Sequence, residues 1–102
     1  MTLLELQFLF MRLIPRLIDK INETHTCTGG DLWAKTGHKQ NSNHYNRLAI
    51  DLNLFTKEGS YITDSLAHKP FGEYWESLHP LCRWGGRFND GNHYSIEYGG
   101  RK

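Results

Sequence analysis

Residues 47–55 read Arg-Leu-Ala-Ile-Asp-Leu-Asn-Leu-Phe, and their alternation of large apolar side chains with smaller or polar ones is typical of a β-strand. We predict a strand over residues 48–55. A polar turn over residues 57–60 follows it, and Tyr61 with Ile62 is predicted to form a short edge strand. The middle of the chain is therefore expected to be an antiparallel hairpin.

The N-terminal segment has apolar residues at helical spacing, which predicts a helix over residues 3–22 that packs against a sheet. Thr2 and Glu5 are placed as a capping box at its start. Pro15 is expected to kink or break this helix, because proline lacks a backbone donor and clashes with the preceding turn. The apolar residues are Leu3, Leu6, Leu9, Phe10, Leu13, Ile14, Leu17, Ile18 and Ile21.

The other segments complete an α+β pattern. Residues 24–43 are predicted to be a loop with one short strand around Leu32, and residues 71–78 a short helix. A glycine-rich loop over residues 84–92 precedes a strand over residues 93–98. This order of elements predicts a small antiparallel sheet covered by helices.

Length and composition are those of one folded domain spanning residues 1–102. The net charge is +1 and the basic residues are scattered, which argues against a nucleic-acid-binding protein. Residues 1–11 lack the basic start of a secretory signal, and no apolar run approaches a membrane span, so we expect synthesis in the cytoplasm and no stable membrane insertion. Cys27 and Cys82 lie far apart without metal-site spacing and are expected to be reduced thiols.

Two clusters carry groups suited to chemistry. In residues 42–51, His44 and Asp51 supply a nitrogen and a hard oxygen, a mixture that suits Zn²⁺. In residues 84–97, His93 offers a third ligand, and three ligands leave one tetrahedral position open for water. Asp90 could accept the proton of that water, although Asp90 followed by glycine is also an ordinary turn signal. The remaining histidines are expected to be exposed and are His25, His38, His68 and His79.

The motifs Ser42-x-His44, Ala49-x-Asp51, Trp84-Gly-Gly and Asp90-x-x-His93 together resemble the family of D-alanyl-D-alanine carboxypeptidases and L-alanyl-D-glutamate peptidases. These are zinc enzymes with the fold of the hedgehog signalling domain. The similarity is closest to phage endolysins in the stretches 47–55, 72–75 and 84–88, and it covers most of the chain from about Gly30 onward.

The resemblance implies that His44, Asp51 and His93 are the zinc ligands and that Asp90 is the general base. It also implies that Ser42 contacts substrate and that Trp84 lines the substrate groove, although a serine before a strand often only closes a turn. Trp84 is equally suited to a hydrophobic core.

One position departs from the family pattern. Members usually carry an arginine upstream of the first zinc histidine, but residues 30–36 contain none. Lys35 is the candidate for the positive charge that contacts substrate, although it lacks the planar fork of arginine. The sequence therefore leaves open a weak enzyme, a differently organised enzyme, or a member without activity.

The function expected from the resemblance is zinc-dependent hydrolysis of a peptide bond in peptidoglycan stem peptides by a monomeric phage endolysin. Such an enzyme would act on the cell wall after the membrane is permeabilised. One alternative is a non-catalytic wall-binding module that retains zinc. Another is a metal-dependent nuclease built on His44, Asn92 and His93, which the near-neutral charge argues against.

Overall fold

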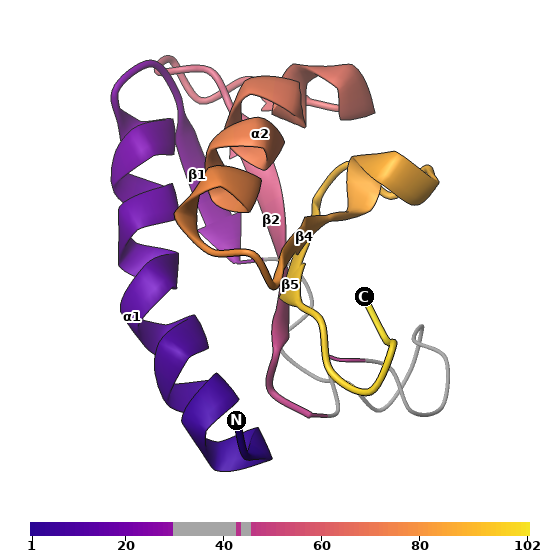
Figure 1. Ribbon diagram of the computed structural model, residues 1–102. Helices are drawn as coiled ribbons and strands as arrows, with labels where there is room; N and C mark the ends of the chain where they lie inside the picture. Colours follow the sequence, from indigo (N-terminus) through magenta and orange to yellow (C-terminus); the bar gives the residue numbers. More distant parts are fainter. Residues whose placement is uncertain (30–42, 44–45) are drawn as a thin grey trace.

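The structure, a computed structural model, describes residues 1–29, 43 and 46–102 (Figure 1). The positions Lys35, His38, Ser42 and His44 and the strand expected around Leu32 lie outside the described residues. The described elements are α1 (Leu3–Asn22), β1 (Thr26–Gly29), β2 (Ala49–Phe55), β3 (Tyr61–Ile62), the 3₁₀ turn η1 (Ser65–His68), α2 (Lys69–Leu78), β4 (Cys82–Trp84), the 3₁₀ turn η2 (Gly85–Phe88) and β5 (His93–Ile96).

The sheet is antiparallel and is organised around β2. Its strand order is β1-β2-β5-β4, and β3 also pairs with β2. One end of β2 pairs with β1 and β3 at Leu54 and Phe55, whereas its first residues, Ala49 to Asp51, pair with β5. Together with the helices, this sheet confirms the predicted small α+β fold and the predicted hairpin of β2 with β3.

Helix α1 has the predicted bounds and the predicted capping box. The Thr2 hydroxyl accepts a hydrogen bond from the Glu5 backbone nitrogen at 3.1 Å, and the Glu5 carboxylate accepts one from the Thr2 nitrogen at 2.8 Å. The helix continues through Pro15, so the break expected there does not occur. Pro15 lies on the exposed face, where water can reach the carbonyl that its ring leaves without a partner.

The core lies where α1 and α2 pack side by side over the sheet (Figure 1). Trp75 of α2 is fully buried, its ring meets the edge of Phe10 of α1 at 5.9 Å, and its indole nitrogen donates to the Ser95 carbonyl of β5 at 2.9 Å. One side chain thus joins both helices to the sheet. No helix of the described residues is both long and apolar enough to cross a membrane.

Several predictions for individual segments need correction. The loop predicted from residue 24 contains β1, which exists because Thr26 to Gly29 pair along β2. Strand β4 and the turn η2 were not predicted, since each is too short for a periodic signal. The helix predicted from residue 71 begins at Lys69, and the strand predicted to residue 98 ends at Ile96.

The two cysteines are free, as expected, and burial raises the pKa of the Cys82 thiol to about 12. His68 is buried rather than exposed, and its Nδ1 lies 2.8 Å from the Tyr94 hydroxyl. Burial, and after it the charge of His25, lowers the pKa of His68 from its ordinary value of 6.5. The predicted exposure failed because the 3₁₀ turn η1 directs this imidazole toward β5.

The lowered pKa of His68 predicts a pH-dependent stability. Below pH 6.5 the unfolded chain takes up a proton at His68 that the folded protein resists, so the free energy of unfolding should fall as the pH falls. His68→Gln should reduce this slope in urea unfolding measured between pH 6.5 and about 5. His79→Gln, at a half-buried histidine, is the matched control. An equal slope in His68→Gln and the unsubstituted protein would contradict the prediction.

Candidate metal centre

Asp51 and His93 face one another across two neighbouring strands. Asp51 is in β2, His93 begins β5, and the antiparallel register makes them direct partners. Direct cross-strand partners project from the same face of a sheet. The His93 Nδ1 atom lies 3.3 Å from Asp51 Oδ1, so strand pairing alone brings an imidazole and a carboxylate together.

Asp90 reaches the same imidazole from the loop before β5. Its backbone nitrogen donates to the Gly85 carbonyl at 2.8 Å, and its own carbonyl accepts from the His93 nitrogen at 3.1 Å. Position 85 has no room for a side chain, because an added Cβ would collide with the Asp90 carbonyl and lie 2.7 Å from the His93 Cβ. This tight packing puts Asp90 Oδ2 3.8 Å from His93 Nδ1.

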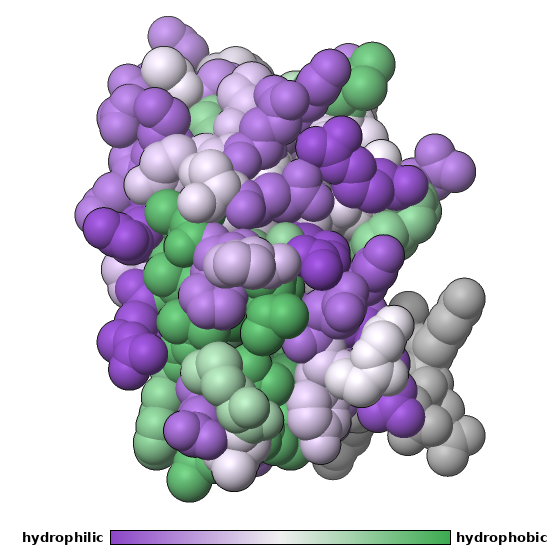
Figure 2. All heavy atoms as spheres, viewed as in Figure 1, coloured by the Kyte–Doolittle hydropathy of each residue, from purple (hydrophilic) through white to green (hydrophobic). Residues whose placement is uncertain are grey.

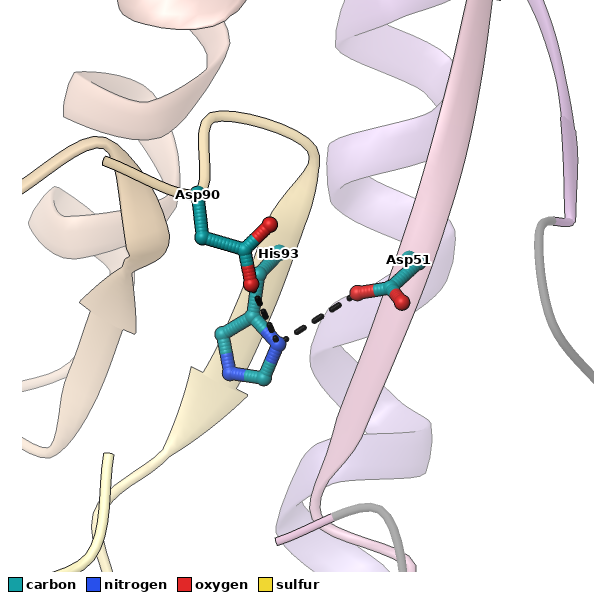
Figure 3. A group of neighbouring side chains, drawn as sticks. All are labelled: Asp51, Asp90 and His93. Carbon is teal, nitrogen blue, oxygen red and sulfur yellow. Dashed lines mark ion pairs between the residues drawn. The ribbon is translucent and has the colours of Figure 1, made fainter. Parts of the chain in front are cut away.

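The three side chains form one group. Figure 3 shows the Asp51 and Asp90 carboxylates directed at the same ring nitrogen of His93. One ligand atom from each residue lies within 4.8 Å of the others. The side chains of His93, Asp51 and Asp90 are 6%, 16% and 50% exposed, so the group runs from the interior to the surface.

The electrostatics favour a cation between the imidazole and the carboxylates. Burial lowers the pKa of His93, but the hydrogen bond and charge of Asp51, the Lys102 carbonyl and the charge of Asp90 together raise the pKa above its ordinary value. The two carboxylates therefore favour positive charge at this ring. A metal ion binds histidine through a deprotonated ring nitrogen, so metal and proton compete for Nδ1.

The donor set fits zinc. Two ligands of one tetrahedral Zn²⁺ with bonds of about 2.0–2.1 Å are about 3.4 Å apart. The 3.3 Å between His93 Nδ1 and Asp51 Oδ1 matches that separation. Asp90 is farther from Nδ1, at 3.8 Å, and is the most exposed of the three. The position of Asp90 suits a group that exchanges protons with water next to the ion better than it suits a ligand of the ion.

Trp84 is a buried side chain with 4% exposure. Its indole nitrogen donates to the Gly91 carbonyl at 2.7 Å, beside Asp90 in the chain. The ring fills the space that a Cβ on Gly72 or Gly86 would need. These contacts explain why glycines accompany Trp84 in the sequence, and they make it a support of the Asp90 loop; contact with substrate stays a prediction.

The described residues thus bring Asp51, Asp90 and His93 together, whereas His44, Ser42 and Lys35 lie outside them. Two other groups around the site were not expected. The carbonyl of Lys102 lies 3.1 Å from His93 Nε2, and the buried Asn43 amide bonds to the chain near the C-terminus. Backbone carbonyls carry no sequence signal, and a single asparagine resembles any turn residue.

Comparison with known protein families identifies a relationship for this chain. The model of the D-alanyl-D-alanine carboxypeptidase family matches residues 36–96, well over half of the 102 residues. That range contains Asp51, Asp90 and His93. No curated protein and no solved structure matches the chain. The family match and the grouped side chains agree, and the chain belongs to the D-alanyl-D-alanine carboxypeptidase family of peptidases.

Proposed function

We propose that the protein is a zinc-dependent peptidase that hydrolyses a peptide bond in peptidoglycan stem peptides. The proposed ligands are His44, Asp51 and His93. The observation that supports this most directly is the 3.3 Å separation of His93 Nδ1 and Asp51 Oδ1 on paired strands. Such a pair, held by the sheet before any metal arrives, is a preorganised half of a zinc site.

Asp90 is the proposed general base. A zinc ion held by this site supplies Lewis-acid chemistry, which polarises a carbonyl and makes water acidic. Asp90 then takes the proton of the attacking water and passes it to the leaving amine. Its 50% exposure and its place at the mouth of the group leave its carboxylate accessible to water and substrate.

The family points to a substrate with D-amino acids, so the proposed bond is either L-Ala–D-Glu or a linkage between D-amino acids. We assign Ser42 and Lys35 to substrate binding, with Lys35 supplying the positive charge that members usually take from arginine. Trp84 would then border the substrate groove through its loop. The proposed setting is phage lysis, in which the enzyme reaches the cell wall after the membrane is permeabilised.

A non-catalytic wall-binding module is the second candidate. The absence of arginine from residues 30–36 favours it, because substrate polarisation would be weaker. The position of Asp90 opposes it, since a zinc site used only for stability or grip does not need an exposed carboxylate beside the histidine.

Digestion of purified peptidoglycan by the zinc-loaded protein tests the proposal. We expect release of a defined new amino terminus, loss of release after chelation, and recovery when zinc is restored. Sequencing the new terminus identifies the bond. A new amino terminus on D-glutamate would indicate endopeptidase action at the L-Ala–D-Glu bond, whereas free D-alanine would indicate carboxypeptidase action.

Three results would contradict the proposal. Full activity in the presence of a strong chelator would exclude the zinc mechanism. One zinc per chain, retention on peptidoglycan and no cleavage would identify the binding module. Cleavage of DNA by the same preparation would point to the nuclease.

A further inference from the structure

We propose that the C-terminal turn, residues 98–102, positions the metal-binding histidine: the Lys102 carbonyl holds a proton on His93 Nε2 and leaves Nδ1 for the metal. This inference rests on the proposed function, because it gives the turn a role at the same centre. It also makes a claim about the metal-free protein that can be tested separately.

The hydrogen bond itself decides which ring nitrogen faces the carboxylates. His93 Nε2 lies 3.1 Å from the Lys102 carbonyl oxygen, and a carbonyl only accepts hydrogen bonds. For this contact to be a hydrogen bond, Nε2 must carry a proton. Nδ1 is then the nitrogen that can bind a metal, and it is the one that lies 3.3 Å from Asp51.

The geometry of the turn places the Lys102 carbonyl beside His93. Tyr98 and Arg101 exchange two backbone hydrogen bonds, at 3.0 and 2.9 Å, so the chain reverses over two residues. Those residues are Gly99 and Gly100, with φ of 57° and 77°. Positive φ at both central positions is the signature of a type I′ turn, which other residues adopt at a cost. The reversal returns the chain alongside β5, toward its His93 end.

Asn43 links the turn to β5 by hydrogen bonds. Its buried side-chain amide donates to the Ile96 carbonyl at 2.9 Å and to the Arg101 carbonyl at 2.8 Å. The Asn43 carbonyl in turn accepts from the Leu48 nitrogen, just before β2, at 2.8 Å. One amide thus links the end of β5 to the residue before Lys102, and Asn43 directly precedes His44 in the chain.

The hydrogen bond to Lys102 has a consequence for affinity. Without an acceptor at Nε2, the ring can place its single proton on Nδ1 and donate it to Asp51. That arrangement competes with a metal for the same nitrogen. Loss of such supporting hydrogen bonds typically weakens metal binding about 10- to 100-fold.

The test uses substitutions that destabilise the turn and leave every residue of the metal site unchanged. Gly99→Val with Gly100→Val forces branched side chains into positive φ, although no atom lies within 4 Å of either new Cβ. The matched control is Gly59→Val in the turn between β2 and β3, which also has positive φ, 94°, and open space around its Cβ. Both variants introduce backbone strain, but only the first affects the Lys102 carbonyl.

The first readout is the imidazole NMR spectrum of the metal-free protein labelled with ¹⁵N-histidine. We expect a protected Nε2–H signal that disappears in His93→Gln, weakens in the Gly99/Gly100 variant and persists in Gly59→Val. A His93 ring protonated only at Nδ1, or an Nε2–H that exchanges as fast as an exposed histidine, would overturn the inference.

The second readout is the zinc dissociation constant, measured by competition with a chelating dye. The Gly99/Gly100 variant should bind zinc about 10- to 100-fold more weakly than Gly59→Val, and Gly99→Asn with Gly100→Asn should restore binding because asparagine tolerates positive φ. Equal affinity in the two valine variants would overturn the inference. Failure of the unsubstituted protein to bind zinc would overturn the proposed function and the metal-supporting role together, whereas the NMR result judges the hydrogen bond alone.

Discussion

Asp90→Asn should lower kcat on peptidoglycan by about 10²- to 10⁴-fold while the protein still binds one zinc. Asparagine has the size of aspartate but cannot take a proton from water. The side chain is half exposed and lies 3.8 Å from His93 Nδ1, outside the closer pair formed with Asp51. Its removal should therefore stop proton transfer without dismantling the metal site. Zinc content by atomic emission and initial rates of bond cleavage measure the two effects.

Asp51→Asn is the matched control, since it makes the same chemical change on the other side of the same ring nitrogen (Figure 3). It should lose both zinc and activity. If Asp90→Asn lost zinc to the same extent, Asp90 would be a ligand instead of the base. If it kept full turnover, Asp90 would have no part in the reaction.

Trp75→Ala should lower the free energy of unfolding by about 3–5 kcal/mol. A domain of this size is stable by only about 5–15 kcal/mol, so much of the margin would be lost. Trp75 is fully buried, contacts Phe10 of α1 and donates to the Ser95 carbonyl of β5. Truncation therefore leaves a cavity between three elements and removes a hydrogen bond to a buried carbonyl. Urea unfolding followed by circular dichroism measures the loss.

Leu66→Ala is the control for this truncation, because Leu66 is 71% exposed and its loss should change stability by no more than about 0.5 kcal/mol. Trp75→Phe helps to separate the two causes, since it keeps a six-membered aromatic ring in the core but lacks the hydrogen-bonding nitrogen. A loss below about 1 kcal/mol for Trp75→Ala would mean that the core closes over the cavity.

The segregation of apolar from polar residues explains why α1 could be predicted so well. Figure 2 shows hydrophobic residues gathered on one part of this face, among hydrophilic ones. Along α1, buried apolar residues recur every three or four positions, and Thr2 with Glu5 marks the start of the helix. Such signals are local, so the sequence alone predicted both bounds. Strands β1 and β4 are short and depend on partners elsewhere in the chain, so their own residues could not predict them.

The candidate site was predictable in its residue types and not in its geometry. Asp51 and His93 were singled out by their chemistry and by the family resemblance, but their pairing depends on the register of β2 with β5. The contacts that hold the site in place arise from packing, which no sequence motif reveals. Position 85 must be glycine, because a Cβ there would collide with Asp90 and His93. Lys102 contacts His93 through its backbone oxygen, which any residue type provides.

The packing of Trp84 against Gly72 and Gly86 also constrains how this sequence can evolve. A side chain cannot be added at either glycine while the indole remains, since the ring occupies both positions that a Cβ would need. A smaller residue at position 84 would open those positions but would give up the bond that ties Gly91 beside Asp90. The three residues can therefore change only in a particular order, with Trp84 first, and every such path begins with a loosened Asp90 loop.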